Sequence, residues 1–578
     1  MMCYVIELRN IIEKENEGIM ERRSFLKLAG CAAGAMTLGG LLAGCAGGAG
    51  EGAAEGSGIA AGDGSSATGV GVGPNGESQV VITMTPSSEP AAGFNPLVAW
   101  GAGEHVHEPL IQSTLITTDN NLEFVNDLAT AYECSEDGMT WTFIIRDDVE
   151  FTDGTPLTAE DVAFTINGIV NGEASEADLS MVREAVATDA YTCELRMERP
   201  DNALLYTLAV VGIVPAHAYG PDYGEHPIGS GRYMLEQWDR GQQVILRANP
   251  DYYGEKPLMD RVVVLFMEED ASLAAAQSGT ADVAYTSAAL ADAVPTGYTL
   301  LNCASVDSRG ISLPCNPAGG TVTEDGVEYA AGNDVTCDLA VRRALNYGID
   351  RTRLIEHVLN GYGHEAFSVG DGMPWSSDAM RVQTDVEEAN RLLDEAGWSR
   401  DGDGMRAKDG VPCAFDLYYS ASDSTRQAIA YDFADQCAEL GIAVNAKGAS
   451  WDDIYARQYA DPVLWGWGSN SPVELFELTY GNGWGNYAQY KNAEVDANLE
   501  AAQAARTVEE SYPFYQAAQW DEETQTGVAP QGAATWVWLA NVDHLYFERE
   551  GLAVAEQKPH PHGHGWSLVN NIDRWSWN

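Results

Sequence analysis

Apolar and polar positions follow one another in patterns that predict strands and helices along most of the chain. Apolar residues at every second position predict a half-buried strand, formed around Trp141, Phe143 and Ile145. Thr158–Asp161 then has the form of a capping box and opens a predicted helix. The buried face of this helix is formed by Val162, Ile166 and Ile169. The nearly continuous apolar segment from Arg261 to Met267 predicts a central strand covered on both faces.

A strand, a helix and a second strand follow one another in the second half of the chain. The first strand has its apolar positions at Phe415, Leu417 and Tyr419. The helix after it carries Ala430, Phe433, Ala434 and Cys437. Gly441 ends that helix, and Ile442–Val444 begins the next strand. Strands joined by a crossover helix in one sheet run parallel, so this unit predicts an α/β lobe.

The first 78 residues show neither pattern. Arg22-Arg23 resembles a twin-arginine export signal, and Leu42–Cys45 resembles a lipobox. The apolar run between them is shorter than the roughly 20 residues that a membrane-spanning helix needs. We therefore expect a signal peptide over residues 1–44, starting at Met1 or Met20, and a lipid on Cys45. Residues 45–78 are rich in Gly, Ala, Ser and Glu, which predicts a flexible tether.

Composition adds two constraints on the part of the chain beyond the tether. About 500 residues are more than one core usually supports, so at least two lobes are expected. The net charge is −54, from 86 acidic and 32 basic residues, which argues against binding to nucleic acid or anionic lipid. The acidic surface is solvated, and adaptation to salt stays an open alternative.

Seven cysteines remain beyond Cys45, and an odd number cannot pair completely within one chain. We expect mostly buried thiols and at most one disulfide, whose partners the sequence does not identify. These cysteines are Cys134, Cys193, Cys303, Cys315, Cys337, Cys413 and Cys437.

A series of short motifs carries a resemblance that covers the chain from Val80 onward. In this order they are Asp137–Ile145, Phe151–Val162, Ile213–His217, Pro227–Tyr233, Asn249–Gly254, Val341–Arg351 and Leu392–Trp398. The series resembles family 5 extracellular solute-binding proteins of ABC importers, the peptide, nickel and opine class. The motifs themselves are structural: Gly229 and Gly231 permit tight turns, and Asp350 can cap the helix after it.

The resemblance implies an α/β fold with two lobes, a clamshell of the periplasmic-binding-protein type (type II, cluster C) with mixed sheets and crossover hinge strands. It places residues 79–304 and 531–578 in the first lobe and residues 305–530 in the second. It further implies a monomer held by its lipid on the outer face of the cytoplasmic membrane, with a permease and a cytoplasmic ATPase as partners. No nucleophile elbow, P-loop or HExxH motif is present, so we expect a binding protein and not an enzyme.

Two classes of ligand stay open, and the first is an oligopeptide. Peptide-binding members of the family carry aspartates that fall here on Gly468 and Ser471, within Trp465–Pro472. Glu474 could replace them, because a buried ammonium needs a carboxylate partner. Aromatic side chains in Gly-, Ser- and Asn-rich segments are expected to line the cleft. The candidate lining residues are Trp100, Trp375, Trp465, Trp467, Ser469, Asn470, Glu474, Trp484 and Tyr487.

The second class is nickel or a nickel chelate, suggested by two histidine clusters. Neutral imidazole is a good ligand for nickel and other divalent metals, and both ends of a clamshell's first lobe meet in space. The candidate metal ligands are His105, His107, His560, His562 and His564. In this interpretation the metal is cargo, and no cofactor is required.

Overall fold

The computed structural model describes residues 71–98, 101–102, 105–172, 175, 177–324, 326–563 and 565–578. The predicted signal peptide, Cys45 and most of the predicted tether lie outside this set, as do Trp100, His564 and the side chain of His105. None of the described helices is long and apolar enough to cross a membrane.

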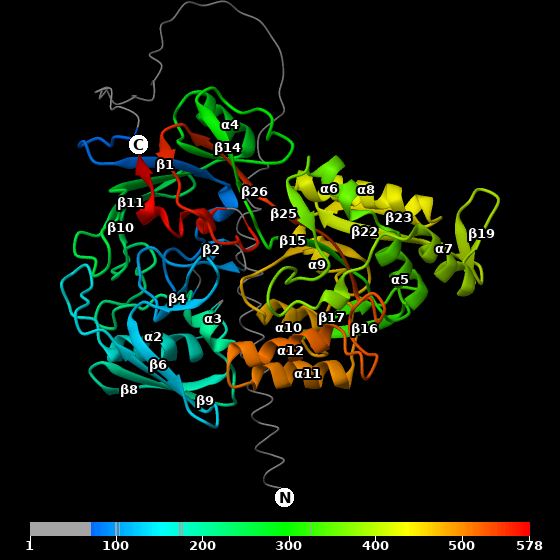
Figure 1. Cartoon of the computed structure of the whole chain (residues 1–578), viewed down its shortest axis with the longest axis horizontal. Helices are drawn as coiled ribbons and strands as arrows, with labels where there is room; N and C mark the ends of the chain where they lie inside the picture. Colours follow the sequence, from blue (N-terminus) through cyan, green and yellow to red (C-terminus); the bar gives the residue numbers. More distant parts are fainter. Residues whose placement is uncertain are drawn as a thin grey trace, which may run out of the picture.

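The chain folds into two lobes that lie side by side in Figure 1, and the first is built on a seven-stranded mixed sheet. The interior strand β12 runs parallel to β1 and antiparallel to β11, and its valines are buried as predicted. The strand order is β10 (Tyr233–Asp239), β11 (Gln243–Ala248), β12 (Arg261–Phe266), β1 (Gln79–Met84), β13 (Val283–Thr286), β26 (His544–Arg549) and β14 (Tyr298–Cys303).

A smaller four-stranded sheet completes the first lobe below this one in Figure 1. Its order is β6 (Ala129–Cys134), β7 (Thr140–Ile145), β9 (Thr192–Met197) and β8 (Val182–Asp189), and helix α2 (Ala159–Val170) packs on β8. The predicted capping box is confirmed, because Asp161 accepts from the backbone N–H of Thr158 at 2.9 Å. The predicted buried positions of β7 and α2 are all buried.

The second lobe is built on a six-stranded sheet. Its order is β18 (Gly363–Glu365), β25 (Trp536–Val542), β15 (Ser308–Ser312), β24 (Val463–Trp467), β22 (Ala414–Ser420) and β23 (Ala443–Ala449). The predicted strand–helix–strand unit is confirmed, since α8 (Ser424–Glu439) joins the parallel strands β22 and β23. Gly441 ends α8 with a φ of +80°, a conformation that suits glycine.

Helices cover both faces of this second sheet. One group contains α5 (Leu339–Gly348), α6 (Arg351–Val358), α7 (Val386–Glu395) and α8, and it shares a core with the sheet. The other group contains α10 (Val473–Thr479), α11 (Ala493–Gln503) and α12 (Val508–Gln519), and it lies at the bottom of Figure 1. The other described α-helices are α3 (Leu204–Leu208) and α4 (Glu269–Gln277) of the first lobe and α9 (Trp451–Tyr455) of the second.

Both lobes also contain short two-stranded sheets, and the second lobe contains one short three-stranded sheet. They are β2 (Gly101–Ala102) with β3 (His105–Val106), β4 (Ile116–Thr118) with β5 (Phe124–Asn126), β16 (Gly320–Glu324) with β17 (Val327–Ala331), β27 (Leu552–Ala553) with β28 (Ser576–Trp577), and β19 (Ser399–Arg400) with β20 (Arg406–Lys408) and β21 (Val411–Pro412).

The chain crosses between the lobes twice among the described residues. It leaves the first lobe between β14 and β15, and it returns between β25 and β26. The return crossing is therefore at Asp543, whereas the sequence placed it near Gln531. The difference arises because every residue of β25 is buried, and burial alone does not indicate which sheet a strand joins.

All seven described cysteines are free thiols, so none of them forms the disulfide that the sequence left open. Burial raises the pKa of Cys193, Cys303 and Cys413 to about 12. Such thiols stay protonated and unreactive at neutral pH.

Candidate functional site

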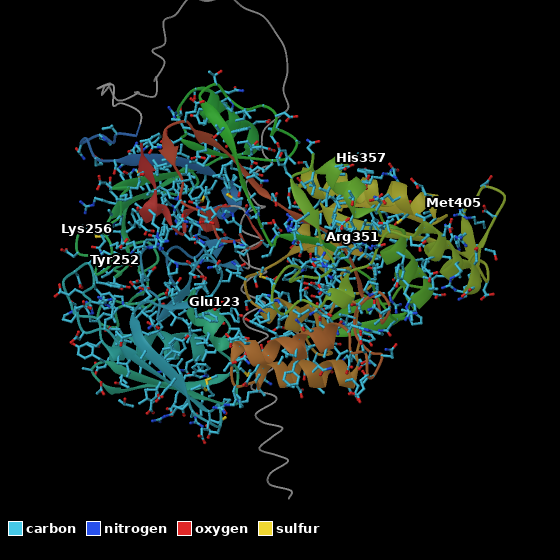
Figure 2. The ribbon with its side chains drawn as sticks, viewed as in Figure 1. Glu123, Tyr252, Lys256, Arg351, His357 and Met405 are labelled. Atoms are coloured by element: carbon cyan, nitrogen blue, oxygen red, sulfur yellow. The ribbon has the colours of Figure 1, made fainter. Side chains whose placement is uncertain are left out.

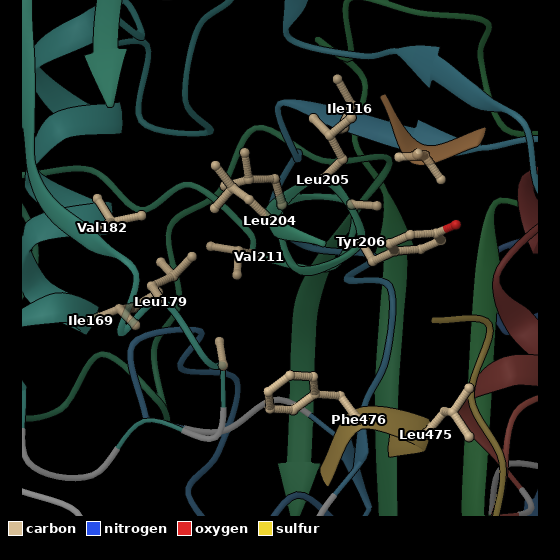
Figure 3. Close-up of a cluster of buried hydrophobic side chains, with 14 of the residues drawn as sticks. Ile116, Ile169, Leu179, Val182, Leu204, Leu205, Tyr206, Val211, Leu475 and Phe476 are labelled. Atoms are coloured by element: carbon tan, nitrogen blue, oxygen red, sulfur yellow. The ribbon is translucent and has the colours of Figure 1, made fainter. Parts of the chain in front are cut away.

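The two lobes contact each other along the edge away from the crossing strands. Asn202, just before α3 in the first lobe, donates from Nδ2 to the carbonyl oxygens of Ala502 at 2.8 Å and Ala505 at 3.1 Å in the second lobe. The rings of Tyr206 and Trp375 meet edge to face at 5.8 Å. Leu205 and Tyr206 of the first lobe share one buried cluster with α10 of the second (Figure 3). The structure is thus a closed arrangement of the lobes.

Four of the predicted aromatic residues form one stacked group in the second lobe. Trp465 stacks on Tyr487 with ring centroids 4.3 Å apart, and Trp467 lies 5.5 Å from Trp484. Trp465, Trp467 and Tyr487 are almost fully buried, while Trp484 is 37% exposed. Trp484 is thus the most exposed member of the stacked group. Trp375 lies apart from them in the lobe contact.

The segment after β24 connects the second lobe to the first. Asn470 donates from Nδ2 to the carbonyl of Pro559 at 3.0 Å, and the N–H of His562 donates to the carbonyl of Gly468 at 2.6 Å. Ser469 makes a local turn by donating to the carbonyl of Ser471 at 3.0 Å. This segment, residues 468–474, therefore lies at the interface of the lobes.

The resemblance implied an aspartate position at Gly468, and the backbone here has a conformation that suits glycine. Its φ is +133°, which glycine tolerates and L residues avoid. A Cβ at this position would also overlap the carbonyl oxygen of Val306. The half-buried Glu474 accepts the N–H of Gly468 at 2.7 Å through Oε2. The carboxylate of Glu474, at the start of α10, therefore lies beside Gly468.

A buried polar cluster lies where the chain leaves the first lobe. Asp307, fully buried, accepts hydrogen bonds from Arg309, His562 and His544, the last at 3.1 Å. Burial alone would raise the pKa of Asp307, but the charges of Arg309 and His562 and the histidine hydrogen bonds hold this pKa well below its usual range. The cluster thus keeps a charged carboxylate at the crossing.

Two of the predicted histidine ligands, His560 and His562, contact the same cluster. His560 is fully buried with its Nδ1 3.1 Å from Nδ1 of His544, and burial and neighbouring charges, including that of His107, lower its pKa well below the usual value. His107 is buried and lies 3.2 Å from the hydroxyl of Ser567. His107 thus affects the pKa of His560 through its charge. Within the described ranges, however, no three His, Cys, Asp or Glu side chains are arranged to hold a metal ion.

A separate open cavity of about 510 Å³ lies on the second lobe alone, beside α6. Figure 2 labels Arg351 and His357 on this helix. Arg381 donates to both oxygens of Asp371 at its wall, and burial raises the pKa of Asp371. None of the residues predicted as ligand contacts lines it; the lining is Thr352, Ile355, Glu356, Gly363, His364, Glu365, Asp371, Gly372 and Arg381.

Comparison with known families decides the identity of this two-lobed chain. A family model for the middle part of bacterial extracellular solute-binding proteins of family 5 matches residues 123–487, which is more than half of the chain. This protein is a family 5 extracellular solute-binding protein. Proteins of this family are the substrate-binding components of ABC importers and act outside the cytoplasm.

Relatives of this solute-binding protein span its folded part. It is 31% identical over 504 residues to Protein XP55 of Streptomyces lividans, covering 83% of this chain and 87% of the relative. Its fold is similar to NikZ from Campylobacter jejuni in complex with Ni(L-His), with a TM-score of 0.71, 22% identity and coverage of 86% and 99%. It is also similar to AppA from Bacillus subtilis in complex with a nonapeptide, with a TM-score of 0.66, 22% identity and coverage of 87% and 99%. These matches confirm the predicted fold class.

Sequence reasoning missed several polar residues of this solute-binding protein. The missed residues are buried: Asp307, Arg309, Arg426 and His544. Asp307 and Arg309 lie directly after the point where the chain leaves the first lobe. A charged pair separated by one residue, Asp307 and Arg309, in an apolar context was the available signal. Local sequence patterns could not predict that Asp307 and Arg309 lie close to Arg426 of α8, because these residues are far apart in the chain.

Proposed function

We propose that this protein captures a short peptide between its lobes and presents it to a membrane permease. The observation that supports this most directly is the half-buried carboxylate of Glu474, placed beside the interlobe segment at Gly468. A peptide's amino terminus carries a positive charge that needs such a partner once water is excluded. The exposed ring of Trp484, next to Trp467, offers apolar contact for a side chain.

The test of this proposal is Glu474→Gln, which removes the charge and keeps the shape. We expect the affinity for a dipeptide mixture, measured by calorimetry, to fall at least about tenfold, because a buried ammonium loses its counter-charge. The matched control is Glu510→Gln on α12, an exposed glutamate of the same lobe, which should leave the affinity unchanged. Equal peptide affinity in both variants would remove Glu474 from the site.

A nickel chelate is the second candidate, favoured by the similarity to NikZ, whose structure contains Ni(L-His). The electrostatic effect of His107 on the pKa of His560 supports it. Against it, His560 and His562 already contact His544 and Asp307. If nickel is cargo, His562→Ala should abolish calorimetric binding of nickel–histidine, and binding that is unchanged in this variant would exclude His562 as a ligand.

We further propose that the protein is a monomer that carries a lipid on Cys45. It docks to a membrane permease, and a cytoplasmic ATPase drives the transport. Motifs in the first 45 residues, outside the described part of the chain, support the lipid. Cys45→Ala should release the protein from the membrane fraction into the medium or periplasm. A variant that stays in the membrane fraction would show that another segment anchors the protein.

A further inference from the structure

The open cavity of about 510 Å³ beside α6 is formed entirely by the second lobe. One wall is a single face of α6, carrying Thr352, Ile355 and Glu356. The other walls are β18 and the segment after it, which contains Asp371 and Arg381. Sites for small molecules commonly have a volume in this range. The cavity therefore has room for a small molecule.

The strand that lines the cavity, β18, lies at the edge of the six-stranded sheet. Its one partner strand among the described residues is β25, so one side of its backbone is not used by the sheet. All three residues of β18, which are Gly363, His364 and Glu365, line the cavity. An edge strand presents carbonyl oxygens and N–H groups to whatever lies beside it. The cavity wall therefore contains backbone acceptors as well as side chains.

Negative charge exceeds positive charge along the walls of the cavity. The carboxylates of Glu356, Glu365 and Asp371 line it, and the guanidinium of Arg381 is the opposing charge among the lining residues. Arg381 donates from Nη2 to both oxygens of Asp371, at 3.0 and 2.9 Å, so these two charges are paired. The two glutamates remain.

Arg351 supplies a second positive charge from behind the wall. Its side chain is buried, and its Nε donates to the carbonyl oxygen of Trp538 at 2.8 Å. Burial lowers the pKa of Arg351 to about 10, and the charges of Glu365 and Asp371 oppose this effect. Arg351 therefore offsets part of the negative charge, on the side of the cavity where Glu365 lies.

His364 is directed at other partners. Its Nε2 lies 3.2 Å from Nδ2 of Asn541, and its Nδ1 lies 3.7 Å from a carboxylate oxygen of Asp543. Glu356 is exposed in the last turn of α6 and makes no ion pair within the part of the chain that the structure describes. The C-terminal end of a helix carries partial negative charge, which adds to that of Glu356. The cavity is therefore suited to a cation.

The acceptors suit an organic ammonium ion better than a metal ion. In the described ranges, no three His, Cys, Asp or Glu side chains are arranged to hold a metal. An ammonium group has three donors, which separate carboxylate and carbonyl oxygens can accept. Glu365 accepts the hydroxyl of Thr352 at 2.7 Å through Oε1. This hydrogen bond orients the carboxylate and leaves Oε2 for a bound donor.

We propose that the cavity beside α6 is a second ligand site of this protein and that it binds a small organic amine as its ammonium ion. The ammonium group donates to Glu356, to Glu365 and to the free edge of β18. Hydrogen bonds between charged partners of this kind are stronger than neutral ones. The site is independent of the proposed peptide capture, because neither Glu474 nor Trp484 lines it.

Thermal unfolding of the folded chain tests this site with propylammonium chloride. The reference is tetramethylammonium chloride at equal ionic strength, whose cation has the same charge and no N–H donor. The Tm of wild type should be higher in propylammonium, because a ligand that binds the native state stabilises it. Equal Tm values in the two salts, or a lower value in propylammonium, would overturn the site. Potassium chloride that reproduces the propylammonium effect would also overturn it, since an inorganic ion would then suffice.

Variants locate the bound amine. The dissociation constant, obtained from the dependence of Tm on propylammonium concentration, should rise at least about tenfold in Glu356→Gln and in Glu365→Gln. The matched control is Glu494→Gln, an exposed glutamate on α11, which should leave this constant unchanged. Glu474→Gln should also leave it unchanged. Loss of the response in Glu474→Gln, with a full response in Glu356→Gln, would place the amine between the lobes and contradict the cavity site.

Peptide binding is measured separately, so that the two proposals can fail independently. Calorimetry with the dipeptide mixture should give the same affinity for wild type and Glu356→Gln. If the dipeptides do not bind wild type, the proposed function fails, and the difference in Tm between the two salts still decides the cavity site. A loss of peptide affinity in Glu356→Gln would contradict a site that is separate from the region between the lobes.

Discussion

At the scale of single residues, the backbone decides which side chains the interlobe segment can carry. Gly468 has a positive φ and sits against the carbonyl of Val306, so an aspartate cannot occupy its position in this conformation. Glu474 brings a carboxylate to the same place from a neighbouring helix.

Gly468→Ala tests this explanation. We expect it to lower the free energy of unfolding by about 2 kcal/mol or more, because the new Cβ meets the Val306 carbonyl in addition to the strained φ. The measurement is chemical denaturation. Gly551→Ala is the control, since Gly551 also has a positive φ of +94° but open space around it. Equal losses for the two variants would show that the contact with Val306 is unimportant.

At the scale of elements, local patterns predicted what depends on local physics. The capping box at Thr158 and the unit of β22, α8 and β23 depend on hydrogen bonding and periodicity within a few residues. The lobe that β25 joins was predicted wrongly, because a fully buried strand fits either sheet. The polar cluster was also missed, since Asp307 and His544 are far apart in the chain and meet only through the crossing strands.

The contact between α3 and α11–α12 holds the lobes together at the edge away from the crossings, and it contains a titratable group. Burial raises the pKa of Asp201, beside Asn202, from its usual 3.8 to about 7. Asp178 and Arg199 of the first lobe and Tyr515 of α12 face it. A raised carboxyl pKa favours the closed form while Asp201 is protonated. That contribution is complete below pH 3.8 and is lost as the pH rises to about 7.

We therefore predict that the peptide affinity of wild type decreases between about pH 4 and 7 more than that of Asp201→Asn, which cannot ionise at this position. Calorimetry at a series of pH values measures the difference, with Asp137→Asn, an exposed aspartate of the first lobe, as the control. Parallel pH profiles for wild type and Asp201→Asn would show that this carboxyl does not influence closure.

At the scale of the whole molecule, the described residues form two lobes that are joined by two crossings and that meet again at the opposite edge. The second lobe contributes the aromatic group and Glu474 to the region between the lobes, and the first lobe contributes His562 and the α3 contact.

Closure of this family 5 protein on a short peptide can be tested directly by titration calorimetry. The purified chain, without its signal segment, is titrated with a dipeptide mixture and separately with nickel–histidine. We expect saturable binding of the dipeptides with a negative heat-capacity change from apolar burial, and weaker or no binding of nickel–histidine. Saturable binding of nickel–histidine with no response to peptides would contradict the proposed function.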